Sequence, residues 1–224
     1  MLASPLSFQQ RGTKGKTPVT VMTSHNTPSA ARDAVFRILR EVARGQSEPA
    51  SLLHATPTTE LKPADRDLTT EIVYGVLRWQ NRLDYILEAR ANRPSNRIDL
   101  PILLALRIGL YQILFLDRVP QRAAVDEAVK IASRYGPPGA QSFVNAVLRA
   151  VCRNPDQPVL PDRNGDPLRY LSITLSHPEW LARRYLYRLG LDGAEARCRF
   201  HNMPAPADLR VEPAMSVEEA QESL

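Results

Sequence analysis

The chain has 224 residues, of which 43 % are apolar and 24 % are charged, enough for one folded domain with a smaller addition. This composition excludes a chain that is disordered throughout. Two cysteines, Cys152 and Cys198, show neither metal-ligand spacing nor a disulfide framework, which fits a reducing cytoplasm. The net charge is +5, and 25 of the 29 cationic side chains are arginine, whose guanidinium group binds phosphate oxygens and stacks on bases. Nucleic acid is therefore the partner that the composition favours.

Residues 1–29 form a polar segment rich in Ser, Thr, Gln and Pro, with a charge of +3 and no acidic residue. It contains no apolar core of the kind found in signal peptides and cannot bury enough surface to fold alone. We therefore predict a disordered basic tail, with Met22 as an alternative translation start close to the first helix.

The first predicted helix runs from Ala30 to about Arg44, with Ser29 as its N-cap and Gly45 as its stop. At 100° per residue its apolar side chains fall on one side and three arginines on the other, with a fourth at one flank: Arg37, Arg40 and Arg44, and then Arg32. This arginine face is a candidate for contact with RNA phosphates. The alternative is an ordinary solvated face that Asp33 and Glu41 neutralise.

Two helical regions follow. The first covers about Pro63–Arg90 and is predicted to break near Gly75 or Trp79; there Arg78, Trp79 and Arg82 combine cations with an aromatic ring. Such combinations form stacking surfaces for nucleic acid, although Trp79 could equally belong to the core. The second region, Pro101–Leu116, is almost wholly apolar. It is too short for a membrane span and carries Arg107 in its middle, so we predict a buried core helix and no membrane association.

Two further helices are predicted over about Arg122–Tyr135 and Ala140–Arg153, and Arg122 is another candidate RNA contact. Together, residues 30–155 read as one all-helical domain with a charge of +5. A Pro-, Asp- and Gly-rich linker then marks a domain boundary, and residues 156–203 read as linker and helices. Ser176–Glu179 has the spacing of a capping box and predicts a helix to about Leu189, before a further helix over Ala194–Asn202.

Residues 204–224 are predicted to begin a small α+β subdomain. Leu209–Glu212 is a short strand candidate, and Ser216–Glu219 resembles the start of another capped helix. One strand and one helix cannot complete a sheet, because the edges of the strand would have no partners. The sequence therefore predicts a truncated subdomain after the helical part.

Six phrases occur in a characteristic order: Ala64–Leu68, Tyr74–Trp79, Val119–Glu127, Phe143–Arg149, Ser176–Leu181 and Asn202–Pro206. In combination they resemble the NusB-like N-terminal region of the bacterial 16S rRNA cytosine-C5 methyltransferases of the Fmu/Sun type, over about residues 30–224. The resemblance implies an all-α NusB-like bundle, a helical linker and the start of a ferredoxin-like subdomain. In that family a Rossmann-like domain follows and carries the S-adenosylmethionine site and both functional cysteines. That catalytic domain is not in this sequence.

Residues that would carry chemistry are not evident. Cys152 and Cys198 lie in predicted helices between arginines, and neither follows a proline as a nucleophile of cytosine-C5 chemistry would. The four histidines form no pair with metal-ligand spacing, and no glycine-rich loop joins a strand to a helix. We therefore expect no catalytic residue, no metal and no cofactor site on this chain.

The resulting hypothesis is an RNA-binding N-terminal region that docks a cytoplasmic methyltransferase on 16S rRNA, with the C-terminal methyltransferase domain in cis and S-adenosylmethionine bound only there. Two alternatives are a stand-alone NusB-like antitermination factor, with RNA and a ribosomal protein as partners, and a helical protein–protein adaptor. Salt dependence separates the adaptor from the other two, because arginine–phosphate binding weakens as salt rises.

Overall fold

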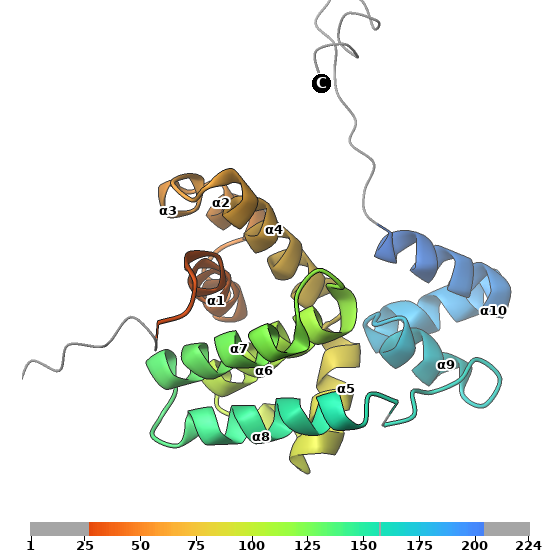
Figure 1. The fold of residues 1–224 in the computed structure, drawn as a ribbon. Helices are drawn as coiled ribbons and strands as arrows, with labels where there is room; N and C mark the ends of the chain where they lie inside the picture. Colours follow the sequence, from red (N-terminus) through yellow and green to blue (C-terminus); the bar gives the residue numbers. More distant parts are fainter. Residues whose placement is uncertain (1–26, 157, 204–224) are drawn as a thin grey trace, which may run out of the picture.

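The computed structural model describes residues 27–156 and 158–203, and this part of the chain contains helices and turns but no strand. The helices are α1 (Ala30–Ala43), α2 (Pro49–Leu53), α3 (Thr56–Thr59), α4 (Pro63–Arg78), α5 (Gln80–Ala91), η2 (Ser95–Arg97), α6 (Leu100–Phe115), α7 (Gln121–Tyr135), α8 (Ala140–Arg153), α9 (Pro167–Arg169), η3 (Tyr170–Thr174) and α10 (Glu179–Asn202) (Figure 1). The predicted all-α fold is confirmed for these residues. The predicted tail up to residue 26 and the predicted subdomain at 204–224 lie outside them.

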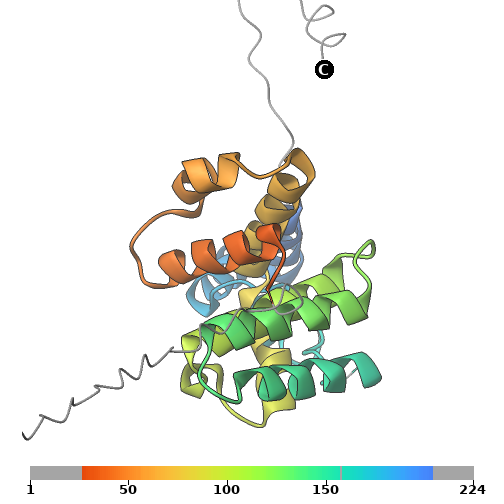
Figure 2. The same cartoon turned by 60° about the vertical axis from the view of Figure 1, so that its left-hand side comes forward.

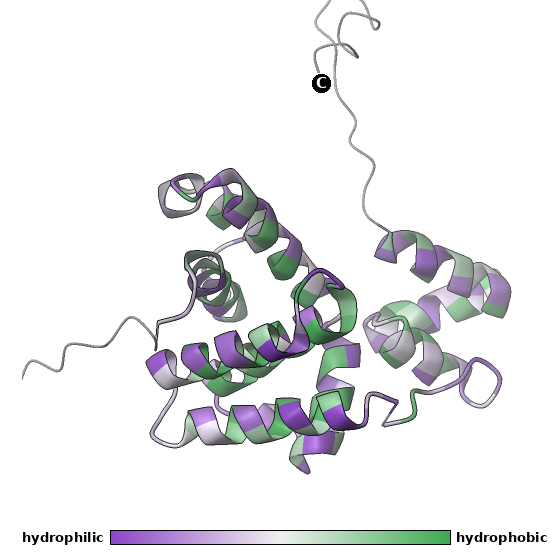
Figure 3. Ribbon diagram, viewed as in Figure 1, coloured by the Kyte–Doolittle hydropathy of each residue, from purple (hydrophilic) through white to green (hydrophobic). Residues whose placement is uncertain are grey.

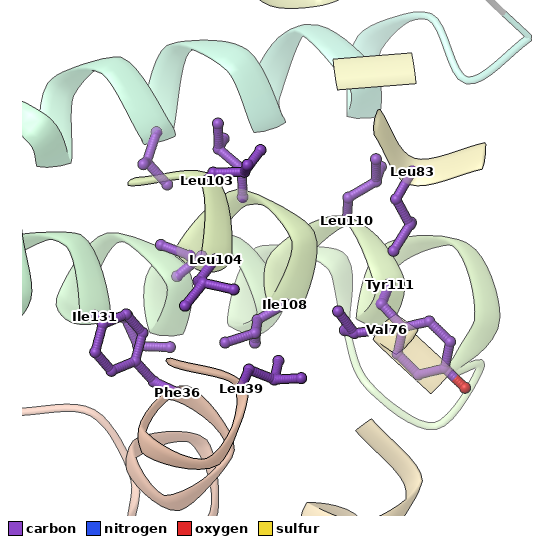
Figure 4. Close-up of a cluster of buried hydrophobic side chains, with 14 of the residues drawn as sticks. Phe36, Leu39, Val76, Leu83, Leu103, Leu104, Ile108, Leu110, Tyr111 and Ile131 are labelled. Atoms are coloured by element: carbon purple, nitrogen blue, oxygen red, sulfur yellow. The ribbon is translucent and has the colours of Figure 1, made fainter. Parts of the chain in front are cut away.

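Helix α6 forms the centre of the bundle. It is apolar on every side, and its residues 103–112 are buried among α1, α4, α5, α7 and α8. A helix that is hydrophobic all round is stable only when other elements cover it on all sides. Figure 4 shows Phe36 of α1, Leu83 of α5 and Ile131 of α7 reaching into the core beside α6. The prediction of a buried core helix is confirmed, and no helix in the described residues is long and apolar enough to cross a membrane.

The two polar interruptions of α6 both have partners. Arg107 donates from Nε and Nη2 to the two carboxylate oxygens of Asp84 on α5, at 2.7 Å each. Gln112 donates to the Ile108 carbonyl at 3.0 Å, and its side-chain oxygen accepts from Arg32. Buried polar groups are tolerated in a core when they are paired in this way.

The helices that contact α6 form with it the larger of two hydrophobic cores. α1 and α4 lie on one side, while α7 and α8 run side by side on another (Figures 1 and 2). Along α8 hydrophilic and hydrophobic residues alternate, as expected for a helix with one buried face (Figure 3). Gly75 allows α4 to approach α6, because a Cβ there would lie 1.9 Å from Cζ of Tyr111.

The structure adds detail to the predicted first half of the chain. The break between α4 and α5 falls at Trp79, one of the two predicted positions. The Trp79 ring stacks on that of Phe115, with the ring centroids 4.9 Å apart. Ser29 is the N-cap of α1, but its side chain makes no capping bond. Its backbone N–H instead donates to Glu127 of α7 at 2.7 Å, which joins α1 to α7. Helices α2 and α3 were not expected from the sequence.

A second, smaller core lies beyond α8. It consists of Tyr170, Leu171, Leu175, Ala182, Ala194 and Cys198. Asn81 of α5 connects it to the larger bundle by donating its side-chain amide to the carbonyls of Ser172 and His177, at 3.2 and 3.0 Å. The segment between the two cores, predicted as a linker, lies against α5: the Tyr85 hydroxyl donates to the Val159 carbonyl at 3.2 Å.

The predicted capping box at Ser176 is wrong. Ser176 has a positive φ of 56°, its hydroxyl accepts a hydrogen bond from the backbone N–H of Asn81, and Pro178 occupies the N-cap of α10. A tertiary contact therefore uses the hydroxyl group that the local pattern assigned to the helix. Gly190, with φ 64° and ψ −178°, kinks α10 into two arms, residues 179–189 and 191–202, close to the two helices expected from the sequence.

Candidate nucleic-acid interface

Three of the predicted arginines share the outer face of α1. Arg37 lies 2.8 Å from Asp33, and its Nε donates to the Tyr135 hydroxyl of α7 at 3.3 Å. The bond to Tyr135 is the main reason that the pKa of Arg37 is raised above its usual value. Arg40 and Arg44 both approach Glu41, at 3.4 and 3.7 Å.

Tyr135 organises the contact between α1 and α7. Its ring stacks on Phe36 with centroids 4.2 Å apart, and its hydroxyl donates to Asp33 at 2.6 Å. Burial, followed by this bond to Asp33, raises the pKa of Tyr135. Arg134 lies over the same ring at 5.3 Å and reaches Asp33 at 3.3 Å, while Arg40 lies 5.9 Å from the ring centre.

These side chains define what we call the α1–α7 arginine cluster: Arg37, Arg40, Arg44 and Arg134, with Asp33, Glu41 and Tyr135. Four guanidinium groups face two carboxylates, so the cluster has an excess of two positive charges. The four arginine side chains are between 31 % and 54 % exposed, so part of each is accessible to a ligand in solution. Half-exposed ion pairs contribute little to stability, so a phosphate group can compete for these arginines at small cost.

Arg32 lies elsewhere, at the contact between α1 and α6. Its Nε donates to the side-chain oxygen of Gln112 at 3.0 Å. Burial lowers its pKa, against the opposing charges of Glu127 and Asp65. The structure therefore places Arg32 in helix packing and apart from the α1–α7 arginine cluster.

The cation–aromatic combination at the α4–α5 break is directed inward. Arg82 lies over the rings of Trp79 and Phe115, at 5.6 and 5.7 Å, and burial lowers its pKa. The rings of Trp79 and Phe115 also stack on each other, so this aromatic pair already has partners within the protein. Arg78 is half-buried at the end of α4. Neither arginine joins the cluster on α1.

Arg122 is the most exposed of the predicted candidates, with 90 % of its side chain exposed and Asp126 at 3.9 Å. It lines a hollow of about 200 Å³ between α7 and α8 together with Gln121, Val125, Arg149 and Cys152. Arg149 is oriented by its bond to Asn145 at 2.7 Å. This hollow is a second cationic surface, separate from the α1–α7 arginine cluster.

The pKa values of Cys152, Cys198 and His177 are shifted by burial towards the uncharged forms of these side chains. Burial raises the pKa of the Cys152 thiol and raises that of Cys198 to about 11, whereas a nucleophilic cysteine needs a lowered pKa. Burial lowers the pKa of His177, whose Nδ1 lies 2.7 Å from the Leu175 carbonyl. Within residues 27–156 and 158–203, no group of three or more His, Cys, Asp or Glu side chains could hold a metal ion.

The structure thus brings Arg37, Arg40 and Arg44 together and places the other four predicted arginines outside this cluster: Arg32 at the α1–α6 contact, Arg78 and Arg82 near the α4–α5 break, and Arg122 beside the α7–α8 hollow. Arg134 and Tyr135 were not predicted as site residues, and they lie about a hundred residues after α1 in the chain. A signal for them was present only as an Arg–Tyr pair at the end of the predicted helix 122–135. Its position beside α1 depends on how α7 packs.

Fold and surface together define a helical binding domain whose first helix presents a cationic face. The chain belongs to the NusB family, whose family model matches residues 29–153. The predicted NusB-like fold is thereby confirmed.

Known proteins resemble a larger part of the chain. The chain is 38 % identical over 184 residues to the "Probable ribosomal RNA small subunit methyltransferase B" of Bacillus subtilis (strain 168), and the match covers 82 % of this chain and 40 % of that protein. The chain therefore spans about two fifths of the length of the curated relatives it matches.

Solved structures share the fold. The crystal structure of PH0851 matches with a TM-score of 0.61 and 20 % identity, over 80 % of this chain and 39 % of that chain. A complex described as "Antitermination Factors NusB and NusE in complex with dsRNA" matches with a TM-score of 0.50 and 24 % identity, over 55 % of this chain and 94 % of that chain. At these identities the likeness concerns the fold alone.

Proposed function

We propose that this chain is the RNA-docking region of a ribosomal RNA small subunit methyltransferase, and that it binds 16S rRNA through the α1–α7 arginine cluster. The observation that carries the proposal is the cluster itself, an excess of exposed guanidinium groups on the first helix of a NusB-family domain. The names of the relatives and a fold neighbour crystallised with double-stranded RNA support the choice of ligand.

The geometry suits binding to the RNA backbone more than reading of sequence. Tyr135 and Asp33 hold Arg37 in place, so less side-chain entropy is lost when a phosphate binds. Arg44, which approaches Glu41, and Arg134, which approaches Asp33, would contact further phosphates, while Arg122 would make a separate contact beside the α7–α8 hollow. Contacts of this kind position a protein on RNA and leave target selection to other groups.

Methyl transfer is not assigned to this chain. Binding of S-adenosylmethionine in Rossmann-like enzymes needs a strand that leads through a glycine-rich loop into a helix. We therefore propose no S-adenosylmethionine site among residues 27–156 and 158–203, in which no strand is found. In the proposal, the cofactor, the cytosine-C5 chemistry and the functional cysteines belong to a methyltransferase domain in cis, and the location is the cytoplasm.

A stand-alone antitermination factor with a ribosomal protein partner is the second candidate. The match to the methyltransferase relative extends over 184 residues, well beyond the part that the NusB family model covers. Beyond residue 153, where the family model ends, the described chain continues into the smaller core and α10, and Asn81 joins the smaller core to the bundle. This favours the methyltransferase assignment.

The proposal is tested by measuring the affinity of the chain for 16S rRNA fragments at several salt concentrations. We expect the affinity to fall steeply as salt rises, and the paired substitution Arg37→Gln and Arg44→Gln to reduce both the affinity and the salt slope. Arg66→Gln, on the exposed side of α4, is the matched control and should change neither strongly. Binding that does not depend on salt, or no RNA binding, would favour the helical adaptor.

A further inference from the structure

Helix α10 leaves unusually many large apolar side chains in contact with solvent. In the described part of the chain, seven large hydrophobic residues are exposed, and five of them lie on α10 or at its end: Trp180, Tyr187, Leu189, Phe200 and Met203. Trp180 is 66 % exposed and Phe200 is 64 % exposed. Clustered exposure of this kind marks an interaction surface more often than isolated exposed residues do.

Three of these side chains, Trp180, Leu189 and Phe200, line hollows along the two arms that meet at the Gly190 kink. One hollow of about 390 Å³ is lined by Trp180, Arg184 and Arg188 of the first arm and by Arg197 of the second. An adjoining hollow of about 420 Å³ also includes Arg197, together with Leu189 and Phe200. Because the two hollows share Leu189 and Arg197, we treat them as one and call it the α10 groove.

The charged side chains that line the α10 groove are all arginines. No carboxylate lines either hollow, and in the described residues Arg184, Arg188 and Arg197 have no ion pair. The acidic side chains of this region are engaged by other arginines: Glu179 pairs with Arg183, and Glu195 with Arg199.

Spacing along α10 places cations and rings next to each other. Trp180, Arg184 and Arg188 follow one another at intervals of four residues, which puts them on one stripe of the first arm. Arg197 and Phe200, three residues apart, repeat the combination on the second arm. Proteins that bind single-stranded nucleic acid use this combination, with arginines along the phosphates and aromatic rings as platforms for unpaired bases.

We propose that the α10 groove binds single-stranded RNA, as a contact separate from the α1–α7 arginine cluster. In Figure 1 the groove-bearing helix lies on the opposite side of the molecule from α1. It also lies outside residues 29–153, which the NusB family model covers. The proposal takes from the proposed function only that the ligand is RNA. Base-paired RNA fits the groove less well, because the faces of its bases are stacked on each other.

The two tryptophans allow a direct test. Trp79 is stacked on Phe115 and covered by Arg82, so quenching of tryptophan emission by an added oligonucleotide reports mainly Trp180. We expect single-stranded U12 to quench the emission of the 224-residue chain and a 12-base-pair RNA duplex of mixed sequence to quench it much less. Trp180→Ala, with binding followed by anisotropy of labelled U12, should weaken binding by roughly five-fold to a hundred-fold.

Matched variants separate this groove from its surroundings. Arg184→Gln with Arg188→Gln should weaken U12 binding at least five-fold, whereas Arg183→Gln, on the same arm but outside the groove, should leave it unchanged. Arg37→Gln with Arg44→Gln should weaken binding to a 16S rRNA fragment but not to U12. U12 binding therefore tests the α10 groove, and binding of the 16S rRNA fragment tests the proposed function, so either can fail without the other.

Three results would overturn the proposal: no binding of U12, equal quenching by the duplex, or U12 binding that is insensitive to the groove substitutions. Residues 204–224 contain five acidic side chains and one arginine, and are a competing occupant by charge. If a synthetic peptide of this sequence quenches Trp180 while U12 does not, the groove is a site for an acidic peptide and the RNA assignment is wrong.

Discussion

The ion pair between Arg107 and Asp84 offers a quantitative test of how the core is built. Only 10 % and 17 % of the two side chains are exposed, and two bonds of 2.7 Å join them inside an otherwise apolar contact between α5 and α6. Asp84→Ala would leave a guanidinium group without its carboxylate among buried leucines. Removing one partner of a buried pair costs about 3–5 kcal/mol, so we expect a loss of that size in the free energy of unfolding.

The double variant Arg107→Met with Asp84→Leu should behave differently. It removes both charges and fills the space with apolar atoms, and such replacements are neutral or stabilising by about 1–4 kcal/mol. Urea unfolding followed by circular dichroism at 222 nm gives the three free energies needed for the comparison. A loss below about 1 kcal/mol for Asp84→Ala, or a double variant as unstable as the single one, would show that the buried pair does not have this effect.

Three further predictions concern packing and titration. Gly109→Ala should lower the free energy of unfolding by about 1–3 kcal/mol, because the new Cβ would lie 2.9 Å from Cβ of Ala128, which cannot rotate away, and 2.5 Å from Cδ1 of Leu148; a wild-type melting temperature would contradict this. The bonds from Arg199, Tyr170 and Arg163 lower the pKa of Glu195 to about 2, from 4.5. The stabilisation from the Glu195 carboxylate is therefore complete above pH 4.5 and is lost as pH falls towards 2. The stability difference between wild type and Glu195→Gln should shrink over that interval in acid unfolding curves. A difference that does not depend on pH would contradict this prediction. Burial raises the pKa of Cys198 to about 11, so its reaction with a thiol reagent at pH 8 should be far slower than that of free cysteine, and rapid labelling of the folded chain would show the thiol to be accessible.

The core could be predicted from sequence where the pattern is local and strong. The apolar run from Leu100 to Phe115 can be stable only if it is covered on all sides, and the structure covers it. The break at Trp79 was one of two predicted positions. Ser176 shows where local reasoning fails: its pattern fits a helix cap, but Asn81, 95 residues earlier, uses the hydroxyl group instead.

The candidate site was predictable in part for the same reason. Helical periodicity placed Arg37, Arg40 and Arg44 on one face, and the structure agrees. Periodicity could not reveal that Arg32 bonds to Gln112, or that Tyr135 would lie against Arg37. Those contacts depend on how α1 packs against α6 and α7. Whether any of the predicted arginines binds RNA stays a prediction.

In the proposed function, the α1–α7 arginine cluster docks this chain on 16S rRNA. Its most direct test is the dissociation constant for a 16S rRNA fragment, measured across a series of salt concentrations for the wild type and for the Arg37→Gln, Arg44→Gln variant. We expect log affinity to fall linearly with log salt, with a slope smaller by about 1–2 in the variant because two phosphate contacts are lost. Equal affinities and equal slopes for both proteins would contradict it.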